Sequence, residues 1–199
     1  MGFYLPLILF CISSTITPGP NNLMLLLSSI NFGIKQSLPH YLGICIGFPV
    51  MVFIIGLGLE SVFTTYPELH LIIKIIGAVY MLWLAYKIII SSAKKEKKPG
   101  SKPLTFIQAA LFQWVNPKAW IMAIGAISTY TTVEGNLSLL FQVIIISIIY
   151  VVVSFICAGF WLFGGKPVKK VLNNEKHLKI FNLILGSLLV ISIIIMIFE

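Results

Sequence analysis

The stretch Thr17-Pro18-Gly19-Pro20-Asn21-Asn22 lies near the middle of the first 34 residues, which carry no Asp, Glu, Lys or Arg. About 20 apolar residues can cross a hydrocarbon core of about 30 Å, and the charged start of a cleavable signal peptide is missing, so we expect a retained membrane span. The two prolines remove backbone donors and clash with the preceding turn, so this helix must break or kink. Pro20 is then well placed as the first residue of a new half-helix.

A second interruption has the same form. Gln113-Trp114-Val115-Asn116-Pro117-Lys118 lies inside the apolar run 103–133. Asn116 is a favourable N-cap and Pro117 a favourable first helical residue, so a second half-helix is predicted to begin there. The alternative is that these prolines and glycines merely kink their helices, as is common in membrane proteins.

The rest of the chain is equally apolar. It has 58% hydrophobic and 10% charged residues, whereas soluble proteins have about 25% charged residues. Charged residues delimit four predicted transmembrane helices, over residues 1–34, 36–59, 135–165 and 180–198. Two further apolar runs, 69–90 interrupted by Lys74 and 103–133 interrupted by Lys118, bring the predicted number to six. We therefore predict an all-α membrane protein with a single domain, residues 1–199.

Two three-helix repeats are predicted within this domain, about 1–91 and 104–199, joined by a Lys-rich loop of about 92–103. Each repeat opens with a proline-broken helix, and an odd number of spans in each repeat inverts the second. Ile75-Ile76-Gly77-Ala78 in the third span is weakly similar to Ile184-Leu185-Gly186-Ser187 in the sixth. Transporters with inverted repeats and interrupted helices bind substrate near the middle of the membrane.

Lysines and glutamates mark the two sides of the membrane. All fourteen cations are lysines and all six anions are glutamates. If both termini lie outside, the inner loops carry twelve lysines and the outer loops none, and cytoplasmic loops show such an excess. The net charge of +8 therefore indicates topology. Nucleic-acid binding is not expected, because the Lys-rich loop has no interleaved aromatic residues.

Lys118 has fifteen uncharged residues on either side and is placed near the bilayer centre, where a lysine costs about 3 kcal/mol. The spans offer no Asp or Glu to neutralise it. We hypothesise that Lys118 and the two half-helix N-termini bind a substrate carboxylate, because helix N-termini favour anions. Neutral hydrogen bonds to the substrate are assigned to Asn21, Asn22, Gln113 and Asn116. The alternative is a lysine held by backbone carbonyls of the broken helices.

Other residues carry weaker signals. Tyr80 is a candidate for lining the cavity in which the substrate would bind. The pairs Gly43/Gly47 and Ala119/Ala123 have the small-xxx-small spacing that favours close helix contacts, within one chain or between two. The three histidines are far apart in sequence, and the three cysteines form no CxxC pair. We therefore expect no metal site and no cofactor.

These motifs together resemble the LysE/RhtB amino-acid exporter family, over about the whole chain. The resemblance rests on the two interruptions, on the Gly43/Gly47 helix, and on Asn31-Phe32-Gly33, Gln36 and Gly77-Ala78-x-Tyr80-x-x-Trp83-x-Ala85. Carried over from the family motifs, the implied site residues are Thr17, Pro18, Gly19, Pro20, Asn21, Gln113, Asn116, Pro117 and Lys118.

The resemblance implies a bacterial inner-membrane exporter of small amino acids, driven by the proton motive force and with some tendency to form a homodimer. The layout is similar to the neutral branch, which includes cysteine/O-acetylserine and homoserine/threonine exporters. A cationic substrate side chain would need an acidic partner within the membrane, and the spans contain none.

Three other functions fit the sequence less well. A nonenzymatic accessory protein leaves the paired helix breaks without an evident purpose. A metal-ion exporter would need carboxylate or imidazole ligands in the spans. A thiol-transferring membrane oxidoreductase would need paired reactive cysteines. We expect a transporter rather than an enzyme. The expected partners of this transporter are a small amino acid, a coupling proton and membrane lipid.

Overall fold

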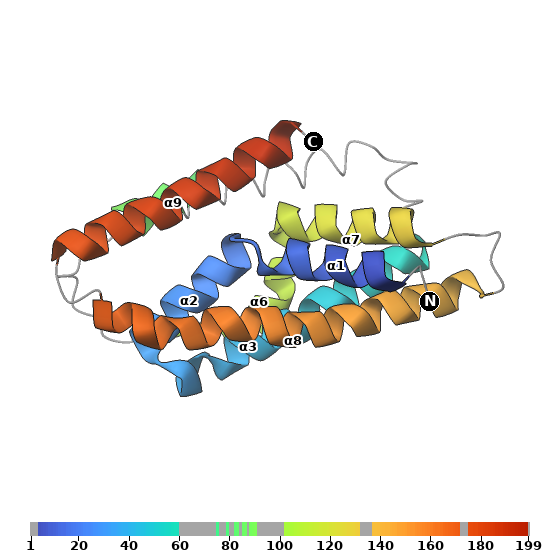
Figure 1. The fold of residues 1–199 in the computed structure, drawn as a ribbon, viewed down its shortest axis with the longest axis horizontal. Coiled ribbons are helices and arrows are strands. Elements are labelled where there is room, and N and C mark those ends of the chain that lie inside the picture. Colours follow the sequence, from blue (N-terminus) through green and yellow to red (C-terminus); the bar gives the residue numbers. More distant parts are fainter. Residues whose placement is uncertain are drawn as a thin grey trace.

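The computed structural model describes residues 4–59, 75, 79, 82, 83, 85, 86, 88–90, 102–131, 137–171 and 175–198. All regular secondary structure within these residues is helical, which confirms the predicted all-α class. Within the described residues seven α-helices have defined bounds (Figure 1): α1 (Tyr4–Ile16), α2 (Pro20–Phe32), α3 (Ile34–Ile54), α6 (Phe106–Phe112), α7 (Pro117–Tyr130), α8 (Leu139–Val171) and α9 (Glu175–Phe198). Most of the run 69–90, with Tyr80, lies outside the described residues.

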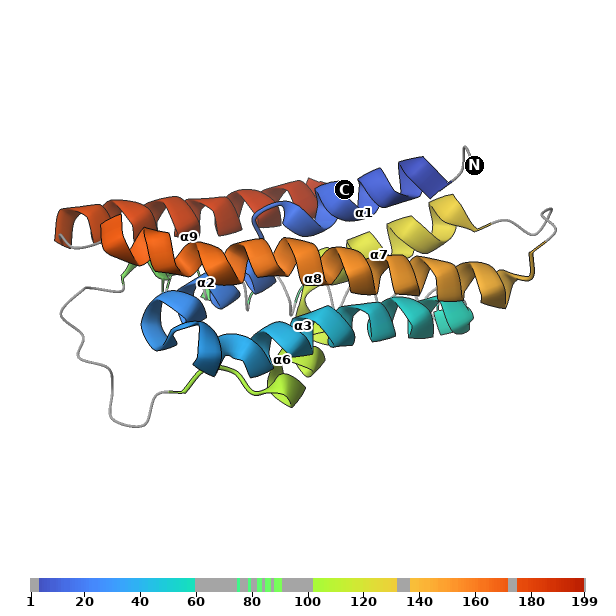
Figure 2. The same cartoon turned by 60° about the horizontal axis from the view of Figure 1, so that its bottom comes forward.

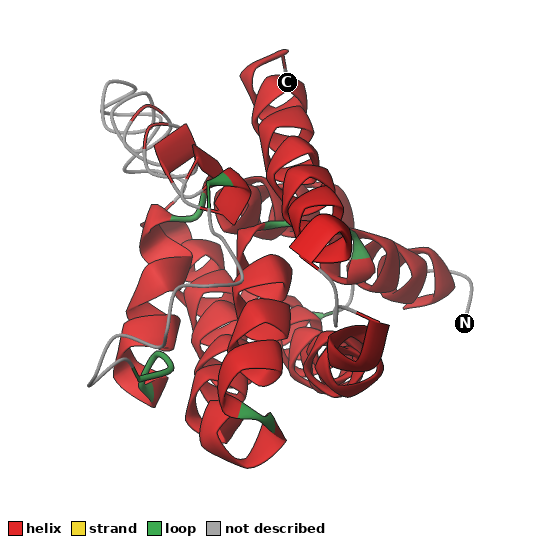
Figure 3. Cartoon of the chain, turned by 90° about the vertical axis from the view of Figure 1, so that its left-hand side faces the viewer, coloured by secondary structure: helices red, strands yellow, loops and turns green. Residues whose placement is uncertain are grey.

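Two of the described helical segments are long and apolar enough to cross a membrane, Ile34–Gly58 and Leu139–Val168. The first is α3 continued by a π-helical turn, Ile55–Leu59. Figure 2 shows α3 and α8 lying side by side over much of their length, and α8 also packs against α1 and α2. Viewed from one end in Figure 3, the helices form a bundle. The structure is therefore organised around two long apolar helices.

Both predicted breaks are present where the sequence places them. α1 ends at Ile16, and α2 begins at Pro20 after an extended Gly19 with φ −171° and ψ 176°. α6 ends at Phe112 and is followed by the 3-10 turn Gln113–Val115 and by an extended Asn116, after which α7 begins at Pro117. The prediction that each proline starts a half-helix is confirmed. Asn116 occupies the N-cap position, but its side chain makes no capping hydrogen bond.

The Gly43/Gly47 pair is used within the chain. A Cβ atom added to Gly47 would lie 2.5 Å from Ala110 Cα, and one added to Gly43 would meet the carbonyl oxygen of Phe106. The absence of side chains at these two positions therefore lets α3 and α6 approach closely. Of the two alternatives for this motif, the structure shows the contact inside one chain.

Gly186 serves a similar purpose on α9. A Cβ atom there would lie 3.2 Å from the carbonyl oxygen of Ala85 and would meet the side chain of Ile89. The sixth predicted span therefore packs against the described part of the third. These contacts join a helix of the second half of the chain to one of the first half.

Candidate functional site

The two broken helices touch at their breaks. Asn21, in the first turn of α2, donates from Nδ2 to Gln113 Oε1 at 2.7 Å. Gln113 Nε2 donates to Asn21 Oδ1 at 3.2 Å and to the carbonyl oxygen of Ala109 at 2.8 Å. Gln113 is fully buried. This reciprocal amide pair joins positions 92 residues apart in the sequence.

Asn22 satisfies the carbonyl groups that the first break exposes. Its Nδ2 atom donates to the carbonyl oxygens of Thr15 at 2.8 Å and Thr17 at 2.9 Å. The last carbonyls of a helix have no partner within it, so a buried helix end requires such donors. The amide of Asn22 therefore holds the end of α1 against the start of α2.

Lys118 crosses from the start of α7 to the other break. Its Nζ atom donates to Thr17 Oγ1 at 2.7 Å, to the Thr17 carbonyl oxygen at 3.0 Å and to the Pro18 carbonyl oxygen at 3.4 Å. These oxygens follow the C-terminal end of α1, where a cation is favoured. The structure thus shows the arrangement that the sequence left as an alternative, a lysine held by backbone carbonyls of a broken helix.

Gly19 makes room for this side chain. A Cβ atom at position 19 would lie 2.9 Å from Lys118 Cδ and 3.1 Å from Lys118 Nζ. Both distances are shorter than ordinary van der Waals contacts. The absence of a side chain at Gly19 therefore allows Lys118 to pass the first break and reach Thr17.

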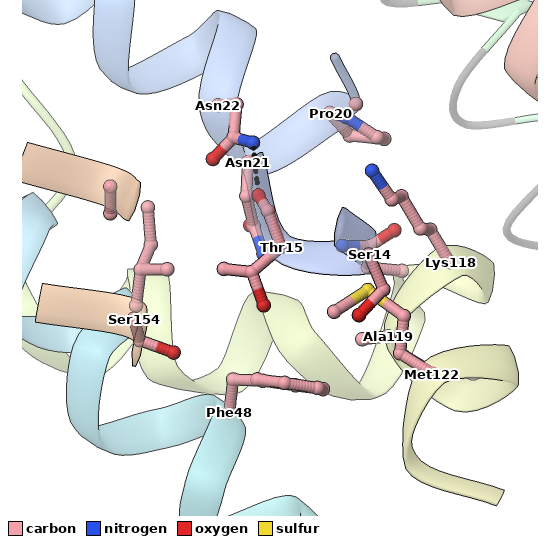
Figure 4. A pocket seen from close by; sticks show the side chains of 14 residues that line it. Ser14, Thr15, Pro20, Asn21, Asn22, Phe48, Lys118, Ala119, Met122 and Ser154 are labelled. Carbon is pink, nitrogen blue, oxygen red and sulfur yellow. Dashed lines mark hydrogen bonds between the residues drawn. The ribbon is translucent and has the colours of Figure 1, made fainter. Parts of the chain in front are cut away.

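A small cavity opens between the two breaks (Figure 4). Its volume is about 30 Å³, which holds about two water molecules. None of its described lining residues is acidic. The lining residues come from α1, the start of α2, α3, α7 and α8: Ser14, Thr15, Gly19, Pro20, Asn21, Asn22, Ile44, Phe48, Asn116, Lys118, Ala119, Met122, Ser154 and Ala158.

Six of the ten predicted binding residues line this cavity: Gly19, Pro20, Asn21, Asn22, Asn116 and Lys118. The other four do not line the cavity but are bonded to residues that do. Thr17 and Pro18 accept the hydrogen bonds of Lys118, and Gln113 holds Asn21. Pro117 is the buried first residue of α7. The structure therefore brings all ten residues into one neighbourhood.

Sequence reasoning missed the contributions of the other helices. Ser14 and Thr15 lie in the last turn of α1, while Phe48 of α3 and Ser154 of α8 line the same cavity. The Oγ1 atom of Thr15, the Oδ1 atom of Asn116 and the Oγ atom of Ser154 are buried and have no hydrogen-bond partner. An isolated serine in an apolar run was the only available signal for Ser154, and it does not reveal which way the side chain points.

A cavity lined by both polar and apolar side chains, between two interrupted helices and among long apolar helices, is typical of helical membrane transporters. The chain belongs to the LysE type translocator family, whose family model matches residues 12–194. This is a family of amino-acid efflux transporters. The family resemblance stated from the sequence motifs is therefore confirmed.

Named relatives agree with this assignment. The chain is 29% identical to a leucine efflux protein from Enterobacter sp. (strain 638), over 88% of this chain and 85% of the relative. It is 34% identical to a cysteine/O-acetylserine efflux protein from Salmonella paratyphi A (strain ATCC 9150 / SARB42), over 61% of this chain and 62% of the relative. The corresponding Escherichia coli (strain K12) protein is 33% identical over the same shares. No solved structure matches the chain.

Proposed function

We propose that this protein exports small neutral amino acids or close derivatives, and that the cavity between the two helix breaks is its substrate site. One observation carries the proposal. The Lys118 ammonium group and the first residues of α2 line the same cavity, and none of its described lining residues is acidic. A carboxylate is the group that an ammonium and a helix N-terminus both favour.

The substrate carboxylate would bind between Lys118 and the backbone N-H groups of Asn21 and Asn22. The first N-H groups of a helix have no partner within it, and Pro20 has no N-H to compete. In the present structure Lys118 is bound to Thr17 and Pro18 instead. On substrate binding, the Lys118 ammonium group would therefore release the neutral oxygens of Thr17 and Pro18 and bind the substrate carboxylate.

Neutral substrates fit the lining better than cationic ones. A cationic side chain on the substrate would be buried without a carboxylate partner, which costs free energy in a low-dielectric site. The relatives are named for leucine and for cysteine and O-acetylserine, whose side chains are uncharged. We assign this chain to the same neutral class.

Transport requires the cavity to open. A volume of about 30 Å³ is too small for an amino acid. The breaks at Thr17 to Gly19 and Gln113 to Asn116 are suitable hinges, because they lack continuous helical hydrogen bonds. We assign them to equivalent places in two inverted three-helix repeats, about 1–91 and 104–199, of a six-span domain whose Lys-rich loops face the cytoplasm.

Coupling to the proton motive force would also pass through Lys118. The proton motive force drives protons inward, so export requires that a proton enter as the amino acid leaves. Loss of the Lys118 proton would remove the charge that holds the substrate carboxylate, so the protonation state of Lys118 would control when the substrate is bound. An imposed pH gradient is therefore expected to change the rate of transport by the purified protein in liposomes. An unchanged rate would contradict this coupling.

Export by overproducing cells tests the function. Cells carrying wild-type protein are expected to release more leucine, cysteine or O-acetylserine than cells carrying Lys118→Gln at equal membrane abundance, by about tenfold. Glutamine retains an N-H donor for Thr17, so the fold should persist. The matched control is Lys166→Gln, at an exposed position on α8. Equal export by the wild type and Lys118→Gln would remove Lys118 from the site, and release of no amino acid by the wild type would favour an accessory protein.

A further inference from the structure

Three oxygen atoms without partners gather around the cavity. They are Thr15 Oγ1 at the end of α1, Asn116 Oδ1 at the N-cap of α7 and Ser154 Oγ in α8. Asn116 and Ser154 are only 2% and 1% exposed. The other buried side-chain polar atoms without partners, among the residues the structure describes, are the two ring nitrogens of His40. Unsatisfied oxygen atoms are thus concentrated at one place.

Two of these atoms, Ser154 Oγ and Asn116 Oδ1, do not make the hydrogen bonds that are usual at their positions in a helix. A serine within a membrane helix commonly donates to the carbonyl four residues earlier, as Ser147 does to Val143 at 2.8 Å. Ser154 does not. Asn116 occupies an N-cap, where the side-chain oxygen usually accepts from the helix backbone, and it makes no such bond. Because an unpaired buried polar atom is costly, these oxygen atoms are suited to bind something that enters the cavity.

The chemistry of these atoms selects the ligand group. An asparagine Oδ1 atom can only accept hydrogen bonds, and hydroxyl oxygens also accept them. A primary ammonium has three N-H donors and no acceptor, so three unpaired oxygens whose residues line one cavity match it. The Lys118 ammonium does not fill this role, because it is bound to Thr17 and Pro18 on the other side.

The cavity is therefore divided into two ends. In Figure 4, Lys118 and Ser154 lie on opposite sides of Thr15, and the Phe48 ring lies beneath the Thr15 hydroxyl. The Lys118 end offers donors and positive charge, whereas the Ser154 end offers acceptors. A zwitterion bound with its carboxylate at Lys118 would direct its ammonium away from that like charge. The face of an aromatic ring adds attraction for a cation.

We propose that Thr15, Asn116 and Ser154 form the subsite for the α-ammonium group of the transported amino acid. This inference rests on the proposed function, since it specifies how the same cavity recognises its substrate. It makes the protein selective for amino acids over the corresponding carboxylic acids, although no described lining residue is acidic. Neutral acceptors would hold the ammonium less tightly than a carboxylate, which favours release after transport.

The test compares each amino acid with the same carbon skeleton lacking its amino group. Binding to the purified full-length chain is measured by calorimetry for leucine, cysteine and O-acetylserine, and for isocaproate, mercaptopropionate and acetoxypropionate. Ser154→Ala is expected to weaken binding of the preferred amino acid about tenfold and to leave its deaminated analogue unchanged. Thr15→Val should act in the same direction. Ser147→Ala, the same change on the same helix, should alter neither.

The outcomes separate this inference from the function on which it rests. If Ser154→Ala and Thr15→Val weaken both members of a pair equally, or neither member, the ammonium subsite is overturned. Lys118→Gln should weaken both members, because both carry the carboxylate. If the wild-type protein binds none of the three amino acids, the proposed function itself fails.

Discussion

Gly19 and Lys118 form the most closely fitted contact of the site. The φ of Gly19 is −171°, an extended conformation that any residue can adopt. The requirement for glycine is therefore set by Lys118 Cδ, which would lie 2.9 Å from an added Cβ atom. The backbone imposes no comparable requirement, so a small substitution can probe the lysine alone.

Gly19→Ala is expected to fold and to displace the Lys118 ammonium from Thr17. A displacement of about 1 Å at a reacting or binding group can cost about a hundredfold in rate, so we expect a loss of export of about tenfold or more. Export and membrane abundance are measured together. Gly125→Ala in α7 is the control, because its Cβ atom would meet only Phe10 at an ordinary 3.5 Å. Wild-type export by Gly19→Ala would show that the position of Lys118 is not critical.

His40 is a buried polar residue outside the cavity. It is 1% exposed in α3, and neither ring nitrogen has a partner. Leaving a buried polar group unpaired costs about 1–3 kcal/mol. His40→Leu removes both nitrogens at similar volume, so we expect the thermal midpoint of the detergent-solubilised protein to rise.

Tyr41→Phe should have the opposite effect. The Tyr41 hydroxyl donates to the Phe155 carbonyl oxygen at 2.7 Å, and its loss should lower stability by about 1 kcal/mol. A lower thermal midpoint for His40→Leu would instead show that the imidazole makes a stabilising contact in the protein.

At the scale of elements, proline alone does not break a helix. Pro39 and Pro49 lie inside α3 and Pro167 lies inside α8, and both helices continue through them. The breaks occur where proline is combined with a second proline and glycine, or follows an asparagine. The first break also has nearby donors, Asn22 and Lys118, for the carbonyl groups that it frees. A membrane helix can end inside the protein only when such donors are present.

The α3 and α6 contact gives a prediction at this scale. Gly47→Ala places a Cβ atom 2.5 Å from Ala110 Cα, and a backbone atom cannot move away unless the helices separate. Overpacking of this kind costs about 1–3 kcal/mol, so the thermal midpoint should fall. Gly164→Ala is the matched control, since its Cβ atom would lie 3.9 Å from Leu26 Cδ1. Equal midpoints for the two variants would contradict the close packing of α3 on α6.

At the scale of the whole molecule, the three cysteines are free and buried. Cys11, Cys45 and Cys157 are each at most 1% exposed, so a maleimide should not label the folded protein. The native chain is then a suitable background for mapping its orientation with single added cysteines.

We expect a membrane-impermeant maleimide to label Asn136→Cys in intact cells and not Ser101→Cys, because the Lys-rich loop is assigned to the cytoplasm. Ser101→Cys should become labelled once the cells are opened. The reverse pattern would invert the proposed topology, and labelling of the unaltered protein would show that a native cysteine is accessible.

The sequence by itself determined the helical class, the location of both helix breaks and the family. Lipid forces apolar backbone into helices, and proline acts on its own turn, so both effects are local and can be read from neighbouring residues. Only the tertiary structure decided that Asn21 pairs with Gln113, that Lys118 reaches Thr17, and that Thr15 and Ser154 face the cavity. These contacts join distant segments, and α8 is apolar on all sides, so no periodicity reveals which of its serines points inward.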